Sequence, residues 1–163
     1  MYPNNKLKQQ SKMQPQPTNW NVYDEIVSAR LLTDTSKVNA VNEHGRTPLH
    51  QLNSLSDETI DFLLENGANI HARDNNGETP LYVAAMEGNH YALKILLTLG
   101  ADPNDADTDG RTPLMLAKDA KTLEILLKVG ADQEIKDNEG ETAMVYHAKM
   151  KDCIQMLKKY AKN

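Results

Sequence analysis

The sequence is poor in the residues that build disulfides and aromatic cores. Only one of its 163 residues is a cysteine, Cys153, so no disulfide can form within the chain. Aromatic residues make up 5% of the chain, with a single Phe and a single Trp. A disulfide-stabilised secreted domain is therefore excluded, and any core must be built mainly from aliphatic side chains.

Long apolar runs are also lacking. No stretch reaches the roughly 18 apolar residues that a membrane span requires, and residues 1–20 lack the apolar segment of a secretory signal. We therefore expect a cytoplasmic protein that makes no membrane contact. A protein exported by a dedicated secretion system would have the same features.

Positive charge is scarce except at the two ends of the chain. Residues 1–19 carry three lysines and no acid, and residues 149–163 carry five lysines against Asp152. The total charge of −5 therefore leaves −12 for the residues between them. Such an acidic body repels phosphate backbones, which argues against nucleic acid and favours a protein partner with a basic patch.

The first part of the chain differs in composition from the rest. Residues 1–18 are rich in Gln, Asn, Lys and Pro and predict a disordered tail, with a docking segment as the alternative. Ordered structure is expected over residues 19–163. Trp20 and Tyr23 near its start either cap the first structural unit or reach a partner.

After this region the sequence repeats itself. Each copy begins with a Gly-x-Thr-Pro-Leu motif and ends, about 20 residues later, at a Gly-Ala pair that follows an apolar i, i+3, i+4 stripe. One such unit cannot bury its own stripe, but a stack of units can. The motif occurs at residues 45–49, 77–81 and 110–114, in a degraded form at 140–144, and the Gly-Ala pairs lie at 67–68, 100–101 and 130–131.

The residues of each copy have the local preferences of a helix–turn–helix unit. A threonine before proline suits a helix N-cap followed by N1. The glycine of each Gly-Ala pair suits the left-handed residue that ends a helix. The Asp/Asn-x-x-Gly segments before the threonines are typical of tight turns.

On these motifs the chain resembles the ankyrin-repeat family. The resemblance implies an all-α, L-shaped solenoid of stacked helix-turn-helix units with projecting β-hairpin loops, which bind proteins through hairpin tips and a concave helix face. It also implies that His50, in Thr-Pro-Leu-His, hydrogen-bonds the neighbouring hairpin. The expected parts are an N-terminal cap at about 19–41, repeats at about 42–74, 75–107 and 108–137, and a capping repeat at 138–163.

The copies depart from one another in ways that predict local differences. The third unit has only 18 residues from its threonine to its closing glycine, against 20 and 21 in the first two, so its helices join almost directly at residues 118–120. We expect it to be the weak link of the stack. Residues 51–53 replace the usual Leu-Ala-Ala, which puts the packing of the first unit in doubt. Tyr82 and Met115 replace the usual histidine and either widen an apolar patch or pack between units.

No group of residues predicts catalysis, a cofactor or a metal. Residues 105–110 match the start of a calcium loop, but Leu116 stands where the bidentate glutamate should be. The five histidines lack the close spacing of a zinc site. Cys153 is expected to be a buried, unreactive thiol. Asn39 and Asn104 occupy a hairpin position that oxygenases hydroxylate in animal members of the family, although a turn role is favoured.

The sequence therefore predicts a non-enzymatic, monomeric protein-interaction module. The alternative is an inhibitor or immunity protein that occludes the active site of a specific enzyme. By family geometry, the partner-binding residues are those of the hairpin tips and the ends of the first helices: Glu43, His44, Arg46, Asn75, Asn76, Glu78, Met86, Glu87, Thr108, Asp109, Arg111, Lys118, Asn138, Glu139 and Glu141.

Overall fold

The computed structural model describes residues 35–53 and 55–161. The predicted tail at 1–18, most of the predicted N-terminal cap, and Trp20 and Tyr23 lie outside the described residues. Every described regular element is helical, so the prediction of an all-α fold is confirmed for this part of the chain. The elements are η2 (Thr35–Lys37), η3 (Pro48–His50), α2 (Asp57–Glu65), α3 (Pro80–Glu87), α4 (His90–Thr98), α5 (Ala120–Lys128), α6 (Ala143–Tyr146) and α7 (Lys151–Tyr160).

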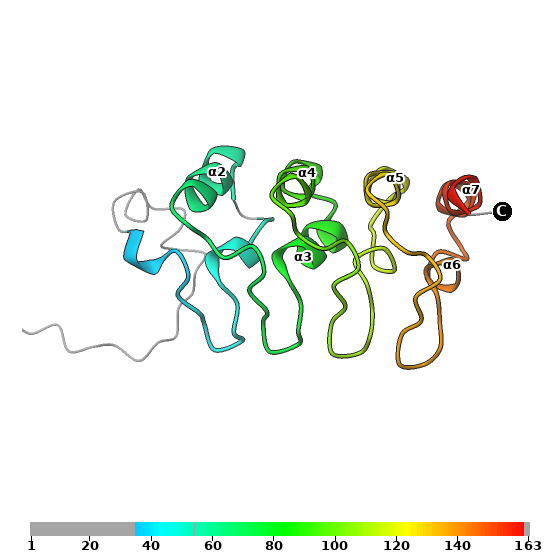
Figure 1. Ribbon diagram of the computed structural model, residues 1–163, viewed down its shortest axis with the longest axis horizontal. Coiled ribbons are helices and arrows are strands. Elements are labelled where there is room, and N and C mark those ends of the chain that lie inside the picture. The colour runs from blue at the N-terminus through cyan, green and yellow to red at the C-terminus, as the bar shows by residue number, and fades with distance from the viewer. Residues whose placement is uncertain (1–34, 54, 162–163) are drawn as a thin grey trace, which may run out of the picture.

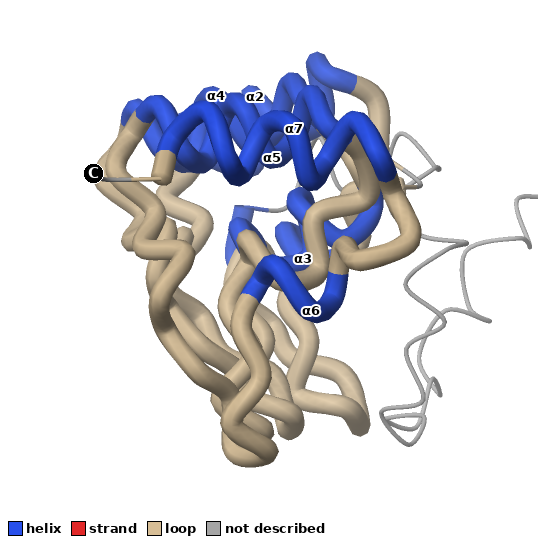
Figure 2. Tube along the Cα trace, turned by 90° about the vertical axis from the view of Figure 1, so that its right-hand side faces the viewer, coloured by secondary structure: helices blue, strands red, loops and turns tan. Residues whose placement is uncertain are grey.

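The units stack side by side into an elongated solenoid. Helices α2, α4, α5 and α7 form one outer row along the long axis, and the inner segments, including α3 and α6, lie beneath them (Figure 1). Seen along the stack, long loops project together from the inner layer, away from the outer row (Figure 2). This arrangement is the L-shaped repeat that the sequence predicted, except that no strand is assigned in the described loops.

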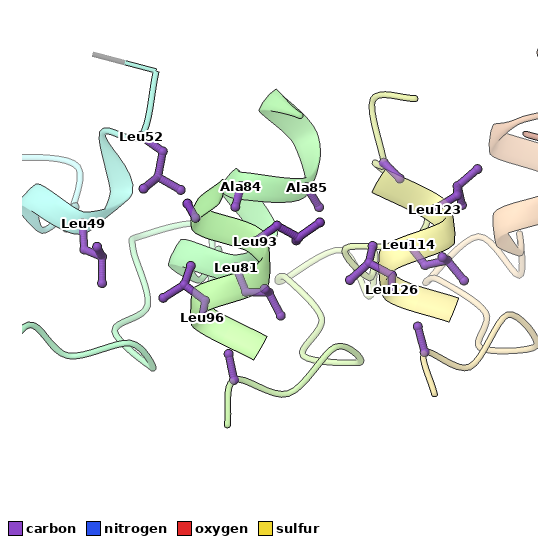
Figure 3. Packing of buried hydrophobic residues seen from close by; sticks show 14 of the residues in the cluster. Leu49, Leu52, Leu81, Ala84, Ala85, Leu93, Leu96, Leu114, Leu123 and Leu126 are labelled. Atoms are coloured by element: carbon purple, nitrogen blue, oxygen red, sulfur yellow. The ribbon is translucent and has the colours of Figure 1, made fainter. Parts of the chain in front are cut away.

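The core runs between the two layers and from one unit to the next. The predicted stripes are buried: Leu93 and Leu96 of α4 and Leu123 and Leu126 of α5 are fully covered. Ala84 of the inner helix α3 is fully buried beside them, as its small side chain allows (Figure 3). Each unit therefore depends on its neighbours for burial of its apolar face.

The inner segments are shorter than the helix of a regular repeat, and only α3 forms more than two turns. The first repeat has one 3-10 turn, η3, and residues 113–116 of the third repeat form turns. Although Leu52 replaces a small residue in the first repeat, it is buried, so packing is kept there despite the short segment. The shortened third repeat places Asp119 directly as the N-cap of α5, where its side chain accepts from the Thr122 amide.

The predicted threonine caps differ from one repeat to the next. Thr79 accepts a hydrogen bond from the Tyr82 amide at the start of α3. Thr47 forms a capping box with His50 at the start of η3, since its amide donates to Nδ1 of His50 at 3.1 Å and its hydroxyl lies 2.9 Å from the same nitrogen. Thr142 makes no side-chain cap bond at the start of α6, and the buried hydroxyl of Thr112 has no partner among the described residues. No inner helix follows Thr112, so there is no first turn for that threonine to cap.

Candidate partner-binding surface

Each projecting loop is built around one Asx side chain. Oδ1 of Asp107 accepts from the backbone amides of Asp109 and Arg111, both at 2.9 Å, and the Asp107 amide donates to the Arg111 carbonyl. These bonds close the loop without a strand ladder. The same set of bonds is made by Asn42, Asp74 and Asp137 in the other loops.

The four loop tips are hydrogen-bonded to one another in series. The amide of Asn75 donates to the His44 carbonyl, and the amide of Thr108 donates to the Asn76 carbonyl, each at 2.9 Å. The Asn138 amide completes the row by donating to the Asp109 carbonyl, also at 2.9 Å. These three bonds make a continuous main-chain ladder across the tips. The tips therefore form one connected surface rather than four independent loops.

Arg46 joins the first loop to the second. Its Nε donates to Oδ2 of Asp74 at 2.8 Å, and its Nη2 donates to Oε2 of Glu78 at 2.5 Å. Burial disfavours the charged form of Asp74, but the hydrogen bonds from Arg46 and from backbone amides outweigh burial and lower its pKa below 3.8. Burial and the nearby charge of Asp74 raise the pKa of Glu78 above 4.5. The pKa values of the two carboxyl groups therefore shift in opposite directions, although the shared guanidinium favours the charged form of both.

Arg111 occupies the same motif position as Arg46 but pairs within its own loop. Its Nη2 lies 2.7 Å from Oδ2 of Asp107 and 2.8 Å from Oδ2 of Asp109. The first residue of each loop explains the difference. The first loop begins with the neutral Asn42, which offers no carboxylate, whereas the third begins with Asp107.

At the histidine position of the motif, two of the three residues connect their inner segment to the next loop. Nε2 of the buried His50 lies 3.1 Å from the Glu78 carbonyl, so its predicted role is confirmed. Tyr82 replaces this contact with a bond from its hydroxyl to Oδ2 of Asp107 at 2.7 Å. Met115 is buried, and its sulfur lies 3.5 Å from the Thr112 amide. Tyr82 and Met115 therefore pack between units and do not form an exposed apolar patch.

Glu78 stands apart from the other predicted contact residues because it is buried. Its carboxylate serves the Arg46 pair and is not presented at a tip. Asn75 and Asn138 also have structural tasks, since their side-chain amides donate to the carbonyls of Glu43 and Thr108. The exposed residues of the predicted set are Glu43, His44, Asn75, Asn76, Thr108, Asp109, Lys118, Asn138 and Glu139, and the half-buried ones are Arg46, Met86, Glu87, Arg111 and Glu141.

Three predicted residues gather at the C-terminal end of α3. Met86 and Glu87 are half-buried there, and Nζ of the exposed Lys118 donates to the Glu87 carbonyl at 2.9 Å. Burial raises the pKa of the Glu87 carboxyl above 4.5, although Lys118 and Arg46 lower it in part. Its Oε2 has no hydrogen-bond partner among the described residues. Because this oxygen is buried, it is not presented to a partner at this corner.

Sequence reasoning missed the role of Arg73, which lies outside the motif. Its Nη2 donates to Oδ1 of Asp105 at 2.6 Å, and its Nη1 donates to the carbonyls of Gly77 and Ala106. This guanidinium holds the arms of the second and third loops together. In the sequence, only the position of Arg73 immediately before Asp74 could have indicated this role.

The carboxylates of residues 105–110, which match the start of a calcium loop, make separate interactions within the loops. Asp105 pairs with Arg73, and both oxygens of Asp107 accept hydrogen bonds within the loop network. Among the described residues, no group of three His, Cys, Asp or Glu side chains could hold a metal ion. No helix in the same part of the chain is long and apolar enough to cross a bilayer.

The remaining candidates from the sequence are Cys153, Asn39 and Asn104, and each lies in a structural rather than a functional environment. Cys153 is buried, and burial raises the pKa of its thiol. Oδ1 of Asn39 accepts from the Asn69 amide at 2.7 Å, and Oδ1 of Asn104 accepts from the Asp132 amide at 2.8 Å. Both asparagines therefore link successive repeats. This finding supports the turn role that the sequence favoured for them.

Comparison with known proteins agrees with this architecture. The family model for ankyrin repeats, three copies, matches residues 53–137. An ankyrin repeat and LEM domain-containing protein 1 homolog of Caenorhabditis elegans is 50% identical over 56 residues, which are 34% of this chain and 8% of that protein. The human ankyrin repeat domain-containing protein 63 is 36% identical over 89 residues, 52% of this chain and 23% of that protein.

A third relative is protein phosphatase 1 regulatory subunit 27 of Mus musculus, 35% identical over 77 residues, 47% of this chain and 50% of that protein. The chain thus spans half or less of the length of each of these relatives. The family match covers just over half of this chain, and the loops, outer row and inner segments have the arrangement its motifs predicted. The chain therefore belongs to the ankyrin-repeat family.

Proposed function

We propose that this chain is a non-enzymatic binding module that holds a protein partner against its loop tips and inner segments. The main-chain ladder across the four tips is the observation that carries this proposal. Because the tips are already held in place, little conformational entropy is lost when a partner binds. The general role of ankyrin repeats in protein–protein interaction supports the proposal. We further propose a cytoplasmic location, since a single cysteine suits a reducing compartment.

The charge of the tips favours a partner with a basic patch. Glu43 and Glu139 are exposed at the tips, whereas the exposed Asp109 is paired with Arg111. The two arginines nearest to them, Arg46 and Arg111, are committed to ion pairs within the loops. Exposed carboxylates of this kind act mainly by steering the encounter and excluding wrong partners.

The proposal is tested by charge reversal at the tips. The full chain captures partners from extracts, mass spectrometry identifies them, and calorimetry then measures the affinity of each purified partner. The Glu43→Lys/Glu139→Lys variant should bind at least about tenfold more weakly, a loss of about 1.4 kcal/mol. The matched control is Glu58→Lys/Glu65→Lys, which makes the same charge change on exposed residues of α2. Equal losses in both variants would refute binding at the tips.

A second candidate is an inhibitor that occludes the active site of an enzyme. The similarity to a mouse protein whose name identifies it as a phosphatase regulatory subunit favours an enzyme as the partner. If the captured partner is an enzyme, its activity is assayed while this chain is added in rising amounts. Stoichiometric loss of the enzyme's activity would support inhibition. If the enzyme stays active when fully bound, the chain binds it without inhibiting it.

A further inference from the structure

The downstream face of the last repeat exposes positions that the other repeats bury. The third residue after the repeat threonine is His50, Tyr82 or Met115 in the first three repeats, and each is at most 2% exposed. Val145 occupies this position in the last repeat and is 50% exposed. Its neighbour Met144 replaces a leucine of the motif and is also exposed. This face is therefore an apolar stacking surface that no described residue covers.

The start of α7 extends this apolar surface. Helices α2, α4 and α5 begin with the polar N-caps Ser56, Asn89 and Asp119, whose side chains each accept a backbone hydrogen bond. Met150 is the N-cap of α7, makes no such bond and is exposed. A polar cap is worth about 1 kcal/mol, so the methionine is costly for an isolated helix. Its apolar side chain instead adds to the exposed apolar surface of the last repeat.

The last repeat also carries exposed lysines. Lys158 lies at the same distance from the start of its helix as the buried Leu127 does in α5, so a charge replaces an apolar stacking residue there. We call the resulting surface the end face. It consists of the apolar residues Met144, Val145 and Met150 and the exposed lysines Lys149, Lys151 and Lys158.

A second surface combines exposed apolar residues with acids. Leu99 and Val129 end α4 and α5 and are 53% and 50% exposed. The turn after Val129 is tied to the segment after Leu99, because the Asp132 amide donates to Oδ1 of Asn104. A depression that follows Val129 in the sequence is lined by residues that include Gly130, Asp132, Glu134 and, from α7, Tyr160.

We call this second surface the acidic edge. Lys128 beside it is paired with Glu124 at 2.9 Å, so the exposed acids dominate its charge. It consists of Leu99, Asp102, Val129, Asp132 and Glu134.

We propose that the end face of one molecule docks on the acidic edge of a second copy. Five of the six large apolar side chains exposed in the described part of the chain belong to these two surfaces, and their charges are opposite. Because the two surfaces differ, the contact is heterologous, and each molecule keeps one free surface of each kind. The assembly therefore extends beyond a dimer as concentration rises, in place of the monomer expected from the sequence.

Sedimentation velocity of the full chain over a range of concentrations provides the first test. At about 0.01 M salt the average mass should rise with concentration. At about 1 M salt, where the Debye length falls from about 30 Å to about 3 Å, association should weaken at least about tenfold. A chain that sediments as a monomer at every concentration and salt would overturn the proposal, and would leave the end face to a different acidic partner.

A mixing experiment tests which surfaces meet. Val145→Glu places an acid in the end face and Val129→Lys places a lysine in the acidic edge. Each variant therefore repels the opposite surface and should be monomeric alone. Their equimolar mixture should form a dimer and nothing larger, because each variant keeps the surface that the other has lost. The control is Val41→Glu, another exposed valine, which lies outside both surfaces and should associate like the parent chain.

Two results of the mixing experiment would contradict the proposal. If the mixture stays monomeric while the parent chain associates, an intact end face does not dock on an intact acidic edge, and the heterologous contact is refuted. If Val129→Lys alone associates like the parent chain, the acidic edge is not the acceptor. Circular dichroism of each variant verifies that all are folded.

Discussion

The hydroxyl of Tyr82 donates a 2.7 Å hydrogen bond to Oδ2 of Asp107, and both residues are buried. This bond ties the inner helix α3 to the following loop, while the preceding junction uses the ring of His50 against the Glu78 carbonyl. Burial, and then the bond to Asp107, raise the pKa of Tyr82 well above its ordinary value. The phenol therefore stays a neutral donor at physiological pH.

Replacing Tyr82 with Phe should destabilise the fold by about 1–2 kcal/mol, because the buried Asp107 loses one of its donors while the ring volume stays the same. Urea unfolding followed by circular dichroism measures this loss. Tyr91→Phe is the matched control, since its hydroxyl bonds to Asp61 in a less buried place. An equal or larger loss in the control would show that the junction adds nothing beyond a surface hydrogen bond.

The paired carboxyls around Arg46 should give opposite dependences of stability on pH. The pKa of Asp74 is lowered on folding, so its contribution is present above its ordinary value of 3.8 and is lost as pH falls through the folded value. The pKa of Glu78 is raised on folding, so its contribution is present below its ordinary value of 4.5 and is lost as pH rises through the folded value.

Two isosteric variants separate these contributions. Asn42 shows that asparagine can hold this kind of loop, so Asp74→Asn keeps the turn and removes the charge. Relative to the parent chain, Asp74→Asn should cost more stability at about pH 7 than at about pH 3, whereas Glu78→Gln should be better tolerated at about pH 7 than at about pH 4. Urea midpoints across this range give both differences. Parallel pH profiles for the two variants would contradict the opposite signs.

His147 should be important for the shortened third repeat. Its Nε2 donates to the Leu114 carbonyl at 2.9 Å, across the junction between the third and fourth repeats. Because residues 113–116 form turns, this carbonyl has no helical partner of its own. His147→Leu should therefore cost about 1–3 kcal/mol by leaving a buried carbonyl without this donor. His71→Leu, at an exposed histidine, should be nearly neutral in the same urea titration.

The third repeat should open more readily than the second. Amides of residues 112–130 should exchange with deuterium faster than those of residues 79–100, since the second repeat has the inner helix α3 whereas the inner segment of the third forms only turns. The amide of Lys118 already depends on a neighbour, donating to the Ala85 carbonyl. Hydrogen exchange followed by mass spectrometry measures the two segments in one sample. Equal protection would refute the weak link that the spacing predicts.

The repeat architecture could be predicted from the sequence because the residues that determine it lie close together in the chain. The Gly-x-Thr-Pro-Leu motif, the apolar stripes and the closing glycines all lie within single units of about 33 residues. Gly67, Gly100 and Gly130 adopt positive φ values of 81°, 95° and 93°, as expected where helices end in left-handed residues. His50 was also predictable, because its role follows from the motif that contains it.

The candidate partner-binding surface could be predicted only in part from the sequence. The sequence placed Glu43, Asn76 and Glu139 in loops, where they are exposed. The sequence could not distinguish these exposed residues from the buried Glu78. Glu78 occupies the same motif position as Arg46 and Arg111, which are half-buried. Burial of Glu78 depends on Arg46, which is 32 residues away in sequence. Pattern within one repeat carries no information about such a contact.

The sequence by itself determined the repeat, its turn chemistry and its aliphatic core, since these follow from periodicity and from backbone preferences of single residues. Only the tertiary structure decided the direction of Arg46 and Arg111, which occupy the same motif position and point to different loops. It also decided how the short inner segments are completed by Lys118 and His147. These features depend on distances between neighbouring repeats, and those distances are set only when the units stack.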